Sequence, residues 1–271
     1  MSSGADGTRE LADGRLLLDE PAAHVARLTI ANPEKRNALD HAILDAIAEA
    51  VPALEARCLL LTGAGQTFSA GYDIGDMPEE TFAEEAEKLV AHPFAAAIAA
   101  LESYPYPSLA ALNGHAIGGG LELALACDLR VAATGALVGM PPAKLGLVYS
   151  HTGLQKFIDA IGIPRTRELF LVGRRVDART ARTWGLVNFI AESDRLADEA
   201  LGLAVEIASN APIAQRGNKR VIRELLSGRG QLGSGIEQEL LELRRSSLSS
   251  EDFQEAVRAF ADKRRPEWKD R

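Results

Sequence analysis

Two glycine-bearing turns hold the residues best suited to chemistry in this chain. One is residues 66–74, QTFSAGYDI, and the other is residues 118–122, GGGLE, which open an apolar run with helical character. Each turn follows a predicted strand, and glycine lets main-chain N–H groups approach a ligand without a Cβ in the way. At a helix start these N–H groups are unpaired and favour negative charge. Either turn alone is typical of a tight bend with positive φ, but the pair side by side predicts an oxyanion hole.

Polar side chains near these turns are candidates for proton transfer. Glu122 follows the three glycines closely enough to act as a general acid or base, although the helix dipole alone also favours a carboxylate there. His151 either protonates an intermediate or lies in a surface loop. The histidines and cysteines lack metal-ligand spacing, so no metal site is predicted.

The elements that must position these residues follow an α/β pattern of strand, glycine turn and helix. Residues 25–30 alternate between the two sides of a strand, and Asp40 is a plausible N-cap for a helix with apolar residues at helical spacing. Short continuous apolar runs predict strands buried on both faces. These runs are residues 58–63, 108–112 and 129–133.

The later part of the chain has a different character. From about residue 195 the sequence is helix-rich, and its last predicted helix has an apolar stripe and a serine cap, either Ser249 or Ser250. The stripe consists of Phe253, Ala256, Val257 and Phe260. We therefore expect a disordered lead over residues 1–14, an α/β core over 15–205 and a helical region over 206–271.

Composition limits the classes of function. The 271 residues carry 30 Lys plus Arg and 38 Asp plus Glu, a net charge of −8, so the chain lacks the basic surplus that nucleic-acid binding requires. No apolar stretch is long enough to span a bilayer, and residues 1–10 do not have the form of a signal peptide. Two cysteines in apolar runs, Cys58 and Cys127, indicate no disulfide framework. The expected location is the cytoplasm, without a membrane partner.

Several motifs of the chain belong to one known pattern. They are residues 32–39 (NPEKRNAL), 68–74 (FSAGYDI), 113–114 (NG), 118–122 (GGGLE), 145–147 (LGL) and 259–264 (AFADKR). Together they resemble the enoyl-CoA hydratase/isomerase (crotonase) superfamily from about residue 15 to the C-terminus. The resemblance implies a ββα-spiral core, a C-terminal helical trimerisation region, and a homotrimer or dimer of trimers. It also implies an acyl-CoA thioester substrate, with coenzyme A as part of the substrate and no tightly bound cofactor.

The resemblance further implies roles for individual positions. The main-chain N–H groups of Ala70 and Gly119 would hold the thioester oxygen, so that an enolate can form. Six positions would contact coenzyme A. Ala70, which thus has two roles, would lie with Asp73 and Ile74 in the adenine pocket, and Arg36 would lie near the phosphates. Phe260 and Lys263 would reach the nucleotide bound to a neighbouring subunit.

One position departs from the pattern of a hydratase. Hydratases of this superfamily use two glutamates on one water; Glu122 matches the first, but Pro142 stands where the second belongs. Proline transfers no proton, so two-glutamate hydration is not expected. A single carboxylate still suffices for an isomerase or a one-base hydratase.

A second resemblance, to methylmalonyl-CoA decarboxylase of the same superfamily, rests on the Leu-Gly-x-x-Tyr pattern ending at Tyr149 and on residues 244–254 and 260–266. Tyr72 departs from it, because that enzyme carries a histidine there. Decarboxylation needs an electron sink and a donor that turns the carboxylate. The phenol of Tyr149 can be this donor, or Tyr149 is an aromatic core residue, and Tyr72 is a second possible donor. The leading prediction is decarboxylation of a short 2-carboxyacyl-CoA, like methylmalonyl- or ethylmalonyl-CoA. The alternative is an enoyl-CoA hydratase or isomerase using Glu122 alone.

Other classes of protein fit the sequence less well. A serine hydrolase would need Gly-x-Ser-x-Gly, but Thr67 occupies the first glycine position before Ser69. A nicotinamide-dependent oxidoreductase would need Gly-x-Gly-x-x-Gly after its first strand, which neither turn provides. A non-catalytic acyl-CoA binder is suggested by Pro142 and opposed by Glu122, Tyr149 and the two turns.

Overall fold

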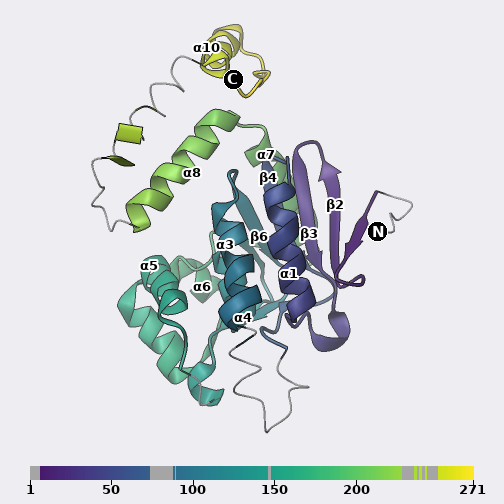
Figure 1. Cartoon of the computed structure of the whole chain (residues 1–271), viewed down its shortest axis with the longest axis vertical. Helices are drawn as coiled ribbons and strands as arrows, with labels where there is room; N and C mark the ends of the chain where they lie inside the picture. Colours follow the sequence, from purple (N-terminus) through teal and green to yellow (C-terminus); the bar gives the residue numbers. More distant parts are fainter. Residues whose placement is uncertain are drawn as a thin grey trace.

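The computed structural model describes residues 7–73, 88, 90–145, 148–227, 235, 236, 238, 239, 242 and 250–271. In this part of the chain the strands form two sheets (Figure 1). The large sheet contains, in spatial order, β1 (Arg9–Leu11), β2 (Leu16–Ala22), β3 (Val25–Ile30), β4 (Cys58–Gly63), β6 (Ser108–Leu112), β8 (Leu129–Ala133) and β11 (Phe189–Ala191). The small sheet contains β10 (Arg175–Asp177), β9 (Leu137–Gly139), β7 (His115–Ile117) and β5 (Thr67–Ser69).

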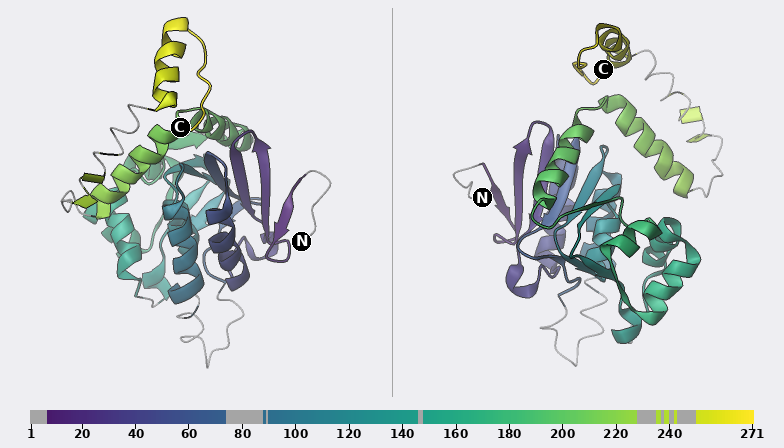
Figure 2. Two further views of the ribbon diagram at one scale, coloured as in Figure 1. Left: turned by 45° about the horizontal axis from the view of Figure 1, so that its top comes forward. Right: turned by 180° about the vertical axis from the view of Figure 1, so that it is seen from behind.

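Helices cover both faces of the large sheet. Figure 1 shows α1 and α3 in front of it, and the rear view of Figure 2 shows α7 across the other face. The α-helices are α1 (His41–Ala50), α3 (Ala95–Ser103), α4 (Gly119–Leu125), α5 (His151–Arg167), α6 (Ala178–Trp184), α7 (Leu196–Ala208), α8 (Pro212–Ser227) and α10 (Glu251–Asp262). Shorter helical turns are η1 (Pro33–Lys35), η2 (Val51–Ala53), η3 (Val90–Phe94), η4 (Pro142–Leu145) and η5 (Glu168–Val172).

The order of the elements repeats a ββα unit. β4 and β5 precede α3, β6 and β7 precede α4, and β8 and β9 precede α5, with the first strand of each unit in the large sheet and the second in the small one. Strands β3, β4, β6, β8 and β11 pair in parallel. The predicted α/β class and ββα spiral are therefore confirmed, and the trimerisation region remains a prediction.

Local sequence accounts for the predicted elements. Every residue of β6 is buried because the strand lies between two layers of helices, which is why it reads as a continuous apolar run. The Asp40 side chain accepts a hydrogen bond from the Ile43 N–H at 2.9 Å and begins α1 as predicted. Helix α1 then buries Ile43, Leu44 and Ile47 against the core.

Two boundaries differ from the prediction. The unstructured lead expected over residues 1–14 is wrong for Arg9–Leu11, which pair antiparallel with β2. Main-chain bonds at a sheet edge hold these three residues, and so short a strand has no readable side-chain pattern. The boundary expected at 205 falls inside α7, whose buried Ala204, Ile207 and Ala208 continue the same packed face. The core therefore extends at least to Ala208.

The C-terminal helices lie at one end of the molecule (Figures 1 and 2). The Ser250 hydroxyl accepts from the Phe253 N–H at 3.1 Å, which confirms Ser250 as the cap of α10. Phe253 of the predicted apolar stripe is 45% exposed, and the other stripe side chains lie outside the described ones. The chain end returns to the core, where Asp270 accepts from the Tyr106 hydroxyl at 2.9 Å. No described helix has the length and apolar character needed to cross a membrane.

Candidate active site

The two glycine-bearing turns meet at one edge of the small sheet. Parallel pairing of β5 with β7 sets Ser69 beside Ala116, so the segments that follow both strands leave the sheet together. A Cβ on Gly71, where φ is +95°, would lie 2.8 Å from the Ile117 carbonyl oxygen and 3.2 Å from the Gly119 nitrogen. Only glycine therefore permits this backbone conformation and this close approach of the turn to α4.

The main-chain donors at this junction differ from the predicted pair. The N–H of Ala70 donates to the Arg36 carbonyl at 3.0 Å, so the prediction of Ala70 as an oxyanion donor is wrong. Residue 72 forms an isolated parallel bridge with Leu39, in which the neighbouring Gly71 carbonyl and Asp73 N–H bond to the Leu39 main chain. This bridge leaves the Tyr72 N–H without a partner among the described residues.

Gly119 supplies the second free donor. It is the first residue of α4, where an N–H has no partner within the helix, and no described residue accepts from it. Helix α4 also directs its positive dipole end toward this point. Tyr72 and Gly119 therefore carry the two N–H groups at this junction that no described residue accepts from, and the oxyanion role of Gly119 stays a prediction.

Glu122 lies in the first turn of α4 and is only 4% exposed. The Tyr149 hydroxyl donates to its Oε2 atom at 2.5 Å. Burial raises the pKa of Glu122 above the ordinary 4.5, while the Tyr149 hydrogen bond and the charge of Lys156 act in the opposite direction. A carboxyl group with a raised pKa is suited to taking up a proton and giving it back.

Tyr72 and Tyr149 extend this hydrogen-bonded group. Their hydroxyl oxygens lie 3.4 Å apart, and burial raises the pKa of both phenols, so both remain protonated at neutral pH. Gly153 of α5 makes room for the arrangement, because a Cβ there would lie 2.6 Å from Tyr149 Cε1 and 3.0 Å from Glu122 Oε2. The structure thus brings together three predicted side chains from α4, the β5–α3 connection and the start of α5.

Three other predicted residues form no hydrogen bond with the side chains of Glu122, Tyr149 or Tyr72. Pro142 is buried at the start of η4 and supplies no proton-transferring group, as expected. His151 is the exposed first residue of α5, and its role stays untested. Asp73, predicted for the adenine pocket, pairs with Lys35 at 2.8 Å.

The other residues predicted to contact coenzyme A do not all lie near Glu122. Arg36 is exposed in a left-handed conformation directly before the buried Asn37, close to the first turn through its carbonyl. Ile74 lies outside the described residues. Phe260 belongs to α10 and Lys263 follows it, at the opposite end of the molecule from α4 (Figure 1). Within one chain these two positions are therefore remote from Glu122.

Asn37 is a positioning residue that sequence reasoning missed. It is fully buried, and its amide nitrogen donates to the carbonyls of Ala64 at 2.9 Å and Thr67 at 2.6 Å, while its oxygen accepts from the Asn32 N–H at 2.9 Å. These bonds connect the turn before α1 to the strand that leads into the first glycine turn. Its presence in the NPEKRNAL segment was the available signal.

Asn37→Ala is expected to destabilise the protein by about 2 kcal/mol, because three partly buried main-chain groups lose their partner. Asn210→Ala, at an exposed position, is the control and should change stability by less than about 0.5 kcal/mol. Urea unfolding of both variants measures the difference. Equal stability of the two variants would contradict the role assigned to Asn37.

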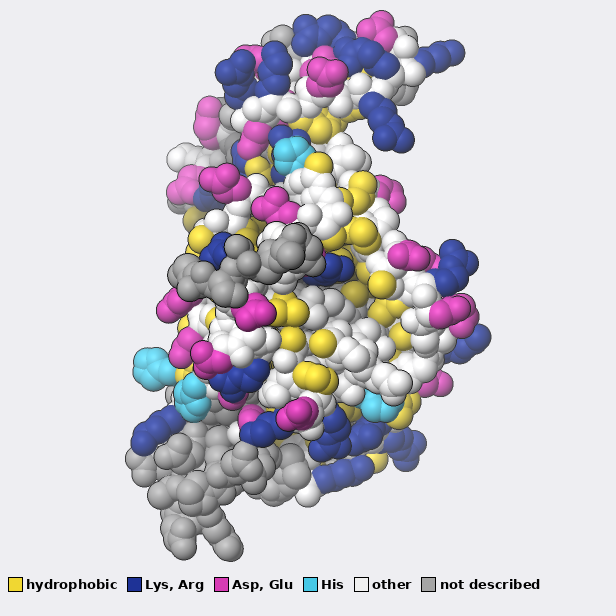
Figure 3. Space-filling view, turned by 90° about the vertical axis from the view of Figure 1, so that its right-hand side faces the viewer, with side chains coloured by type: hydrophobic (Ala, Val, Ile, Leu, Met, Phe, Trp, Pro, Cys, Tyr) yellow, Lys and Arg dark blue, Asp and Glu magenta, His cyan; other side chains and the backbone are white. Residues whose placement is uncertain are grey.

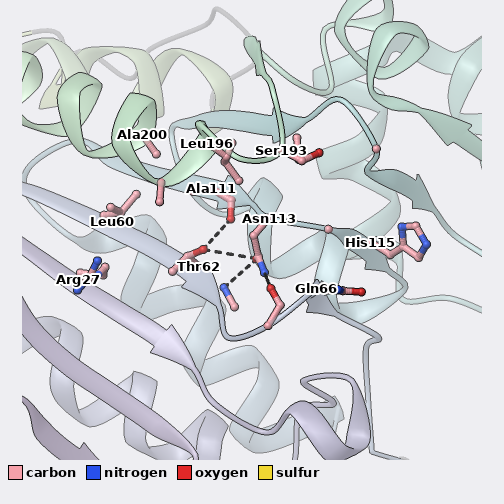
Figure 4. Close-up of a pocket in the computed structure, with 16 residues that line it drawn as sticks. Arg27, Leu60, Thr62, Gln66, Ala111, Asn113, His115, Ser193, Leu196 and Ala200 are labelled. Carbon is pink, nitrogen blue, oxygen red and sulfur yellow. Dashed lines mark hydrogen bonds between the residues drawn. The ribbon is translucent and has the colours of Figure 1, made fainter.

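A cavity lies elsewhere, between α7 and the carboxyl ends of β4 and β6 (Figure 4). Its volume is about 630 Å³. The Thr62 hydroxyl and Asn113 amide that face it already bond to the protein, at 3.0 Å to the Ala111 carbonyl and 2.8 Å to the Gly65 carbonyl. None of Glu122, Tyr149 and Tyr72 borders this cavity.

The spiral core and the main-chain donors beside a buried carboxylate define a crotonase-type protein. The chain matches the enoyl-CoA hydratase/isomerase model over residues 20–271 and belongs to that family. It is 33% identical to 2,3-dehydroadipyl-CoA hydratase of Escherichia coli, over 91% of this chain and 96% of that protein. It is also 33% identical to enoyl-CoA isomerase/hydratase fer4 of Mycosarcoma maydis, over 89% and 91%. The crystal structure of enoyl-CoA hydratase from Bacillus anthracis superposes with a TM-score of 0.85 at 30% identity, covering 95% and 100%.

Proposed function

We propose that this protein adds water to the double bond of an enoyl-CoA thioester, with Glu122 as its catalytic carboxylate. The observation that carries the proposal is the buried Glu122, with its raised pKa, in the first turn of α4 beside the free N–H of Gly119. The names of the relatives, which are hydratases or isomerase/hydratases, support the same reaction.

This proposal takes the place of decarboxylation as the preferred reaction. Decarboxylation would require the Tyr149 hydroxyl to face a substrate carboxylate, but that hydroxyl donates to Glu122. A carboxylate placed next to Glu122 would also meet a like charge, which is unfavourable in a buried site. None of the relatives reported above carries the name of a decarboxylase.

The proposed reaction assigns roles to two main-chain N–H groups, to Glu122 and to Tyr149. The N–H groups of Tyr72 and Gly119 hold the thioester oxygen. Glu122 takes a proton from water as the water oxygen bonds to the β-carbon, and the electron pair of the double bond moves onto the thioester oxygen as an enolate. Glu122 then returns the proton to the α-carbon, while Tyr149 holds the carboxylate in place.

A shift of the double bond is the second candidate, and Pro142 favours it. Isomerisation removes a proton from one carbon and returns it to another, which a single carboxylate can do without a second one to hold water. The same thioester site serves both reactions, so substrate choice separates them.

Coenzyme A enters the proposal as part of the substrate and not as a bound cofactor. Arg36, Asp73 and Ile74 are proposed contacts within the chain, and Phe260 and Lys263 are proposed contacts to a neighbouring subunit. A homotrimer or dimer of trimers built by residues 206–271 fits the exposed apolar side chains of Ile222, Leu226 and Phe253. A cytoplasmic location remains a prediction.

The reaction is tested on purified protein with four substrates offered separately: crotonyl-CoA, a 3-enoyl-CoA, methylmalonyl-CoA and ethylmalonyl-CoA. Mass spectrometry follows the gain of water or the loss of carbon dioxide, and the ultraviolet absorbance of the conjugated enoyl thioester follows the double-bond shift, which leaves the mass unchanged. Gain of water on crotonyl-CoA is the expected result. Loss of carbon dioxide from a malonyl derivative, with crotonyl-CoA untouched, would overturn the proposal. Thermal stabilisation by all four esters without turnover would identify a non-catalytic binder.

Tyr149→Phe is expected to lower activity by about tenfold, because a hydrogen bond to a charged group is lost. The bond lowers the pKa of Glu122, so its loss should raise that pKa further and move the acidic limb of the pH–rate profile to higher pH. Tyr106→Phe, which removes the hydroxyl bonded to Asp270 outside the site, is the control and should leave the profile in place. A Tyr149→Phe profile identical to that of the wild type would refute the contact.

A further inference from the structure

One face of α5 lies against the Glu122–Tyr149 pair. Gly153 is on this face, because a Cβ there would lie 3.0 Å from Glu122 Oε2. Phe157, four residues later, is fully buried and meets the Phe170 ring edge-on, with ring centroids 5.1 Å apart. The Phe170 ring in turn meets that of Tyr149, with centroids 5.4 Å apart. These contacts fix the orientation of α5 relative to the carboxyl group.

Lys156 stands on the same face of α5. Residues three apart on a helix are neighbours with Cβ atoms about 5–6 Å apart, so the Cβ of Lys156 lies within about 9 Å of Glu122 Oε2. The Lys156 ammonium group donates to Oε1 of Glu102, in the last turn of α3. The side chain of Lys156 is only 23% exposed. Its charge therefore acts partly through protein, where salt screens it less than at the surface.

The groups that act on Glu122 come from each segment packed around it. They are Tyr149 before α5, Tyr72 in the β5–α3 connection, Lys156 on α5 and Glu102 on α3. Burial raises the pKa of Glu122, the Tyr149 hydrogen bond and the charge of Lys156 lower it, and the charge of Glu102 raises it. More distant charges of both signs are interspersed on the face drawn in Figure 3, so they offset one another. The two members of one ion pair thus act on the same carboxyl group in opposite directions.

We infer that the Lys156–Glu102 ion pair sets the charge state of Glu122: Lys156 favours the ionised form that accepts a proton, and Glu102 limits this effect by pairing with the same ammonium group. Both are positioning residues, since they act on the reaction only through Glu122. The inference rests on the proposed function in one respect, which is that Glu122 takes the proton from water. Opposed charges suit a group that must take up a proton and then return it, because a strong base returns it slowly and a weak base does not take it.

Two substitutions test the pair in opposite directions. Lys156→Met removes the positive charge, so the acidic limb of the pH profile of kcat/KM should move to higher pH. Glu102→Gln removes the negative charge and leaves the ammonium group without its partner, so the limb should move to lower pH. The rate above the midpoint should stay within about threefold of the wild type, because neither side chain transfers the proton. A merely structural ion pair would give shifts of the same sign, because both variants break the same contact.

Titration of Glu122 without substrate supplies a second readout. Infrared difference spectroscopy follows the C=O stretch of the protonated carboxyl group, assigned as the band that Glu122→Gln lacks. Its midpoint should move in the same two directions as the kinetic limb. Lys156→Arg keeps the charge, and Arg195→Gln breaks the exposed Arg195–Glu199 pair at the start of α7. Both are controls and should leave the midpoint in place.

The outcomes separate the ion pair from the reaction. Shifts of the same sign in Lys156→Met and Glu102→Gln, or no infrared shift in either, would overturn the inference. Opposite infrared shifts, together with no turnover of any enoyl-CoA, would retain the effect of the pair on Glu122 and refute the proposed function.

Discussion

Glu122→Gln is expected to lower kcat by about 1,000-fold, within the range for loss of a general acid–base group. Glutamine keeps the shape of the side chain, and its oxygen can still accept the Tyr149 hydrogen bond, but it cannot take up a proton. Steady-state assay on the substrate identified by mass spectrometry measures the loss. Full activity of the variant would remove Glu122 from the mechanism.

The same substitution should not lower stability at neutral pH. Burial raises the pKa of Glu122 in the folded protein above 4.5, so its contribution to stability is fully present below that value and is lost as pH rises through the folded-state pKa. An uncharged glutamine avoids the cost of the buried charge, so the melting temperature at neutral pH should be equal or higher. Glu49→Gln, at an exposed position on α1, is the control and should change neither activity nor stability.

Gly71→Ala has the second largest expected effect. The added Cβ would lie 2.8 Å from the Ile117 carbonyl oxygen, a main-chain atom, in a backbone with φ of +95°. The first turn must therefore move away from α4, which would shift the Tyr72 N–H relative to that of Gly119 and disrupt the proposed oxyanion hole. We expect a loss of about 100-fold or more in kcat, the order seen on removing one oxyanion donor, with a stability loss of about 2 kcal/mol.

Gly65→Ala separates backbone strain from the loss of the site. Gly65 also has a positive φ, +70°, but the nearest atom to its Cβ would be Pro33 Cβ at 3.9 Å, an ordinary contact. The variant should lose about 1–2 kcal/mol of stability and keep its kcat. If Gly65→Ala and Gly71→Ala lose activity equally, strain alone explains the effect and the close approach of the two turns does not matter for catalysis.

Much of this site could be predicted because its signals are local. The GGGLE segment places Glu122 in the first turn of a helix, whatever the rest of the fold does. The buried strands were readable because apolar runs bounded by turns have few other uses in an α/β chain. Tyr149 was predicted through its place in a motif, and its bond to Glu122 joins residues 27 positions apart.

The errors concern features that only tertiary structure decides. Ala70 and Tyr72 are two residues apart, and both belong to the same motif. Which N–H is free depends on the pairing of this turn with Arg36 and Leu39, more than 30 positions earlier. Asn37 was missed for the same reason, since its amide reaches Thr67, 30 residues away. Short-range patterns contain no information about such pairings.

The oxyanion donors belong to the main chain, and this has a consequence for how such a site can change in evolution. A codon change alters a side chain but leaves an N–H group in place, unless the new residue is proline or cannot adopt the backbone conformation. Substitutions at positions 72, 142 and 149 can therefore sample new reactions on a scaffold that still holds a thioester. Substitutions at these three positions change the side chains that set the reaction, whereas substitutions at Gly71 or Asn37 disturb the backbone that positions the N–H groups.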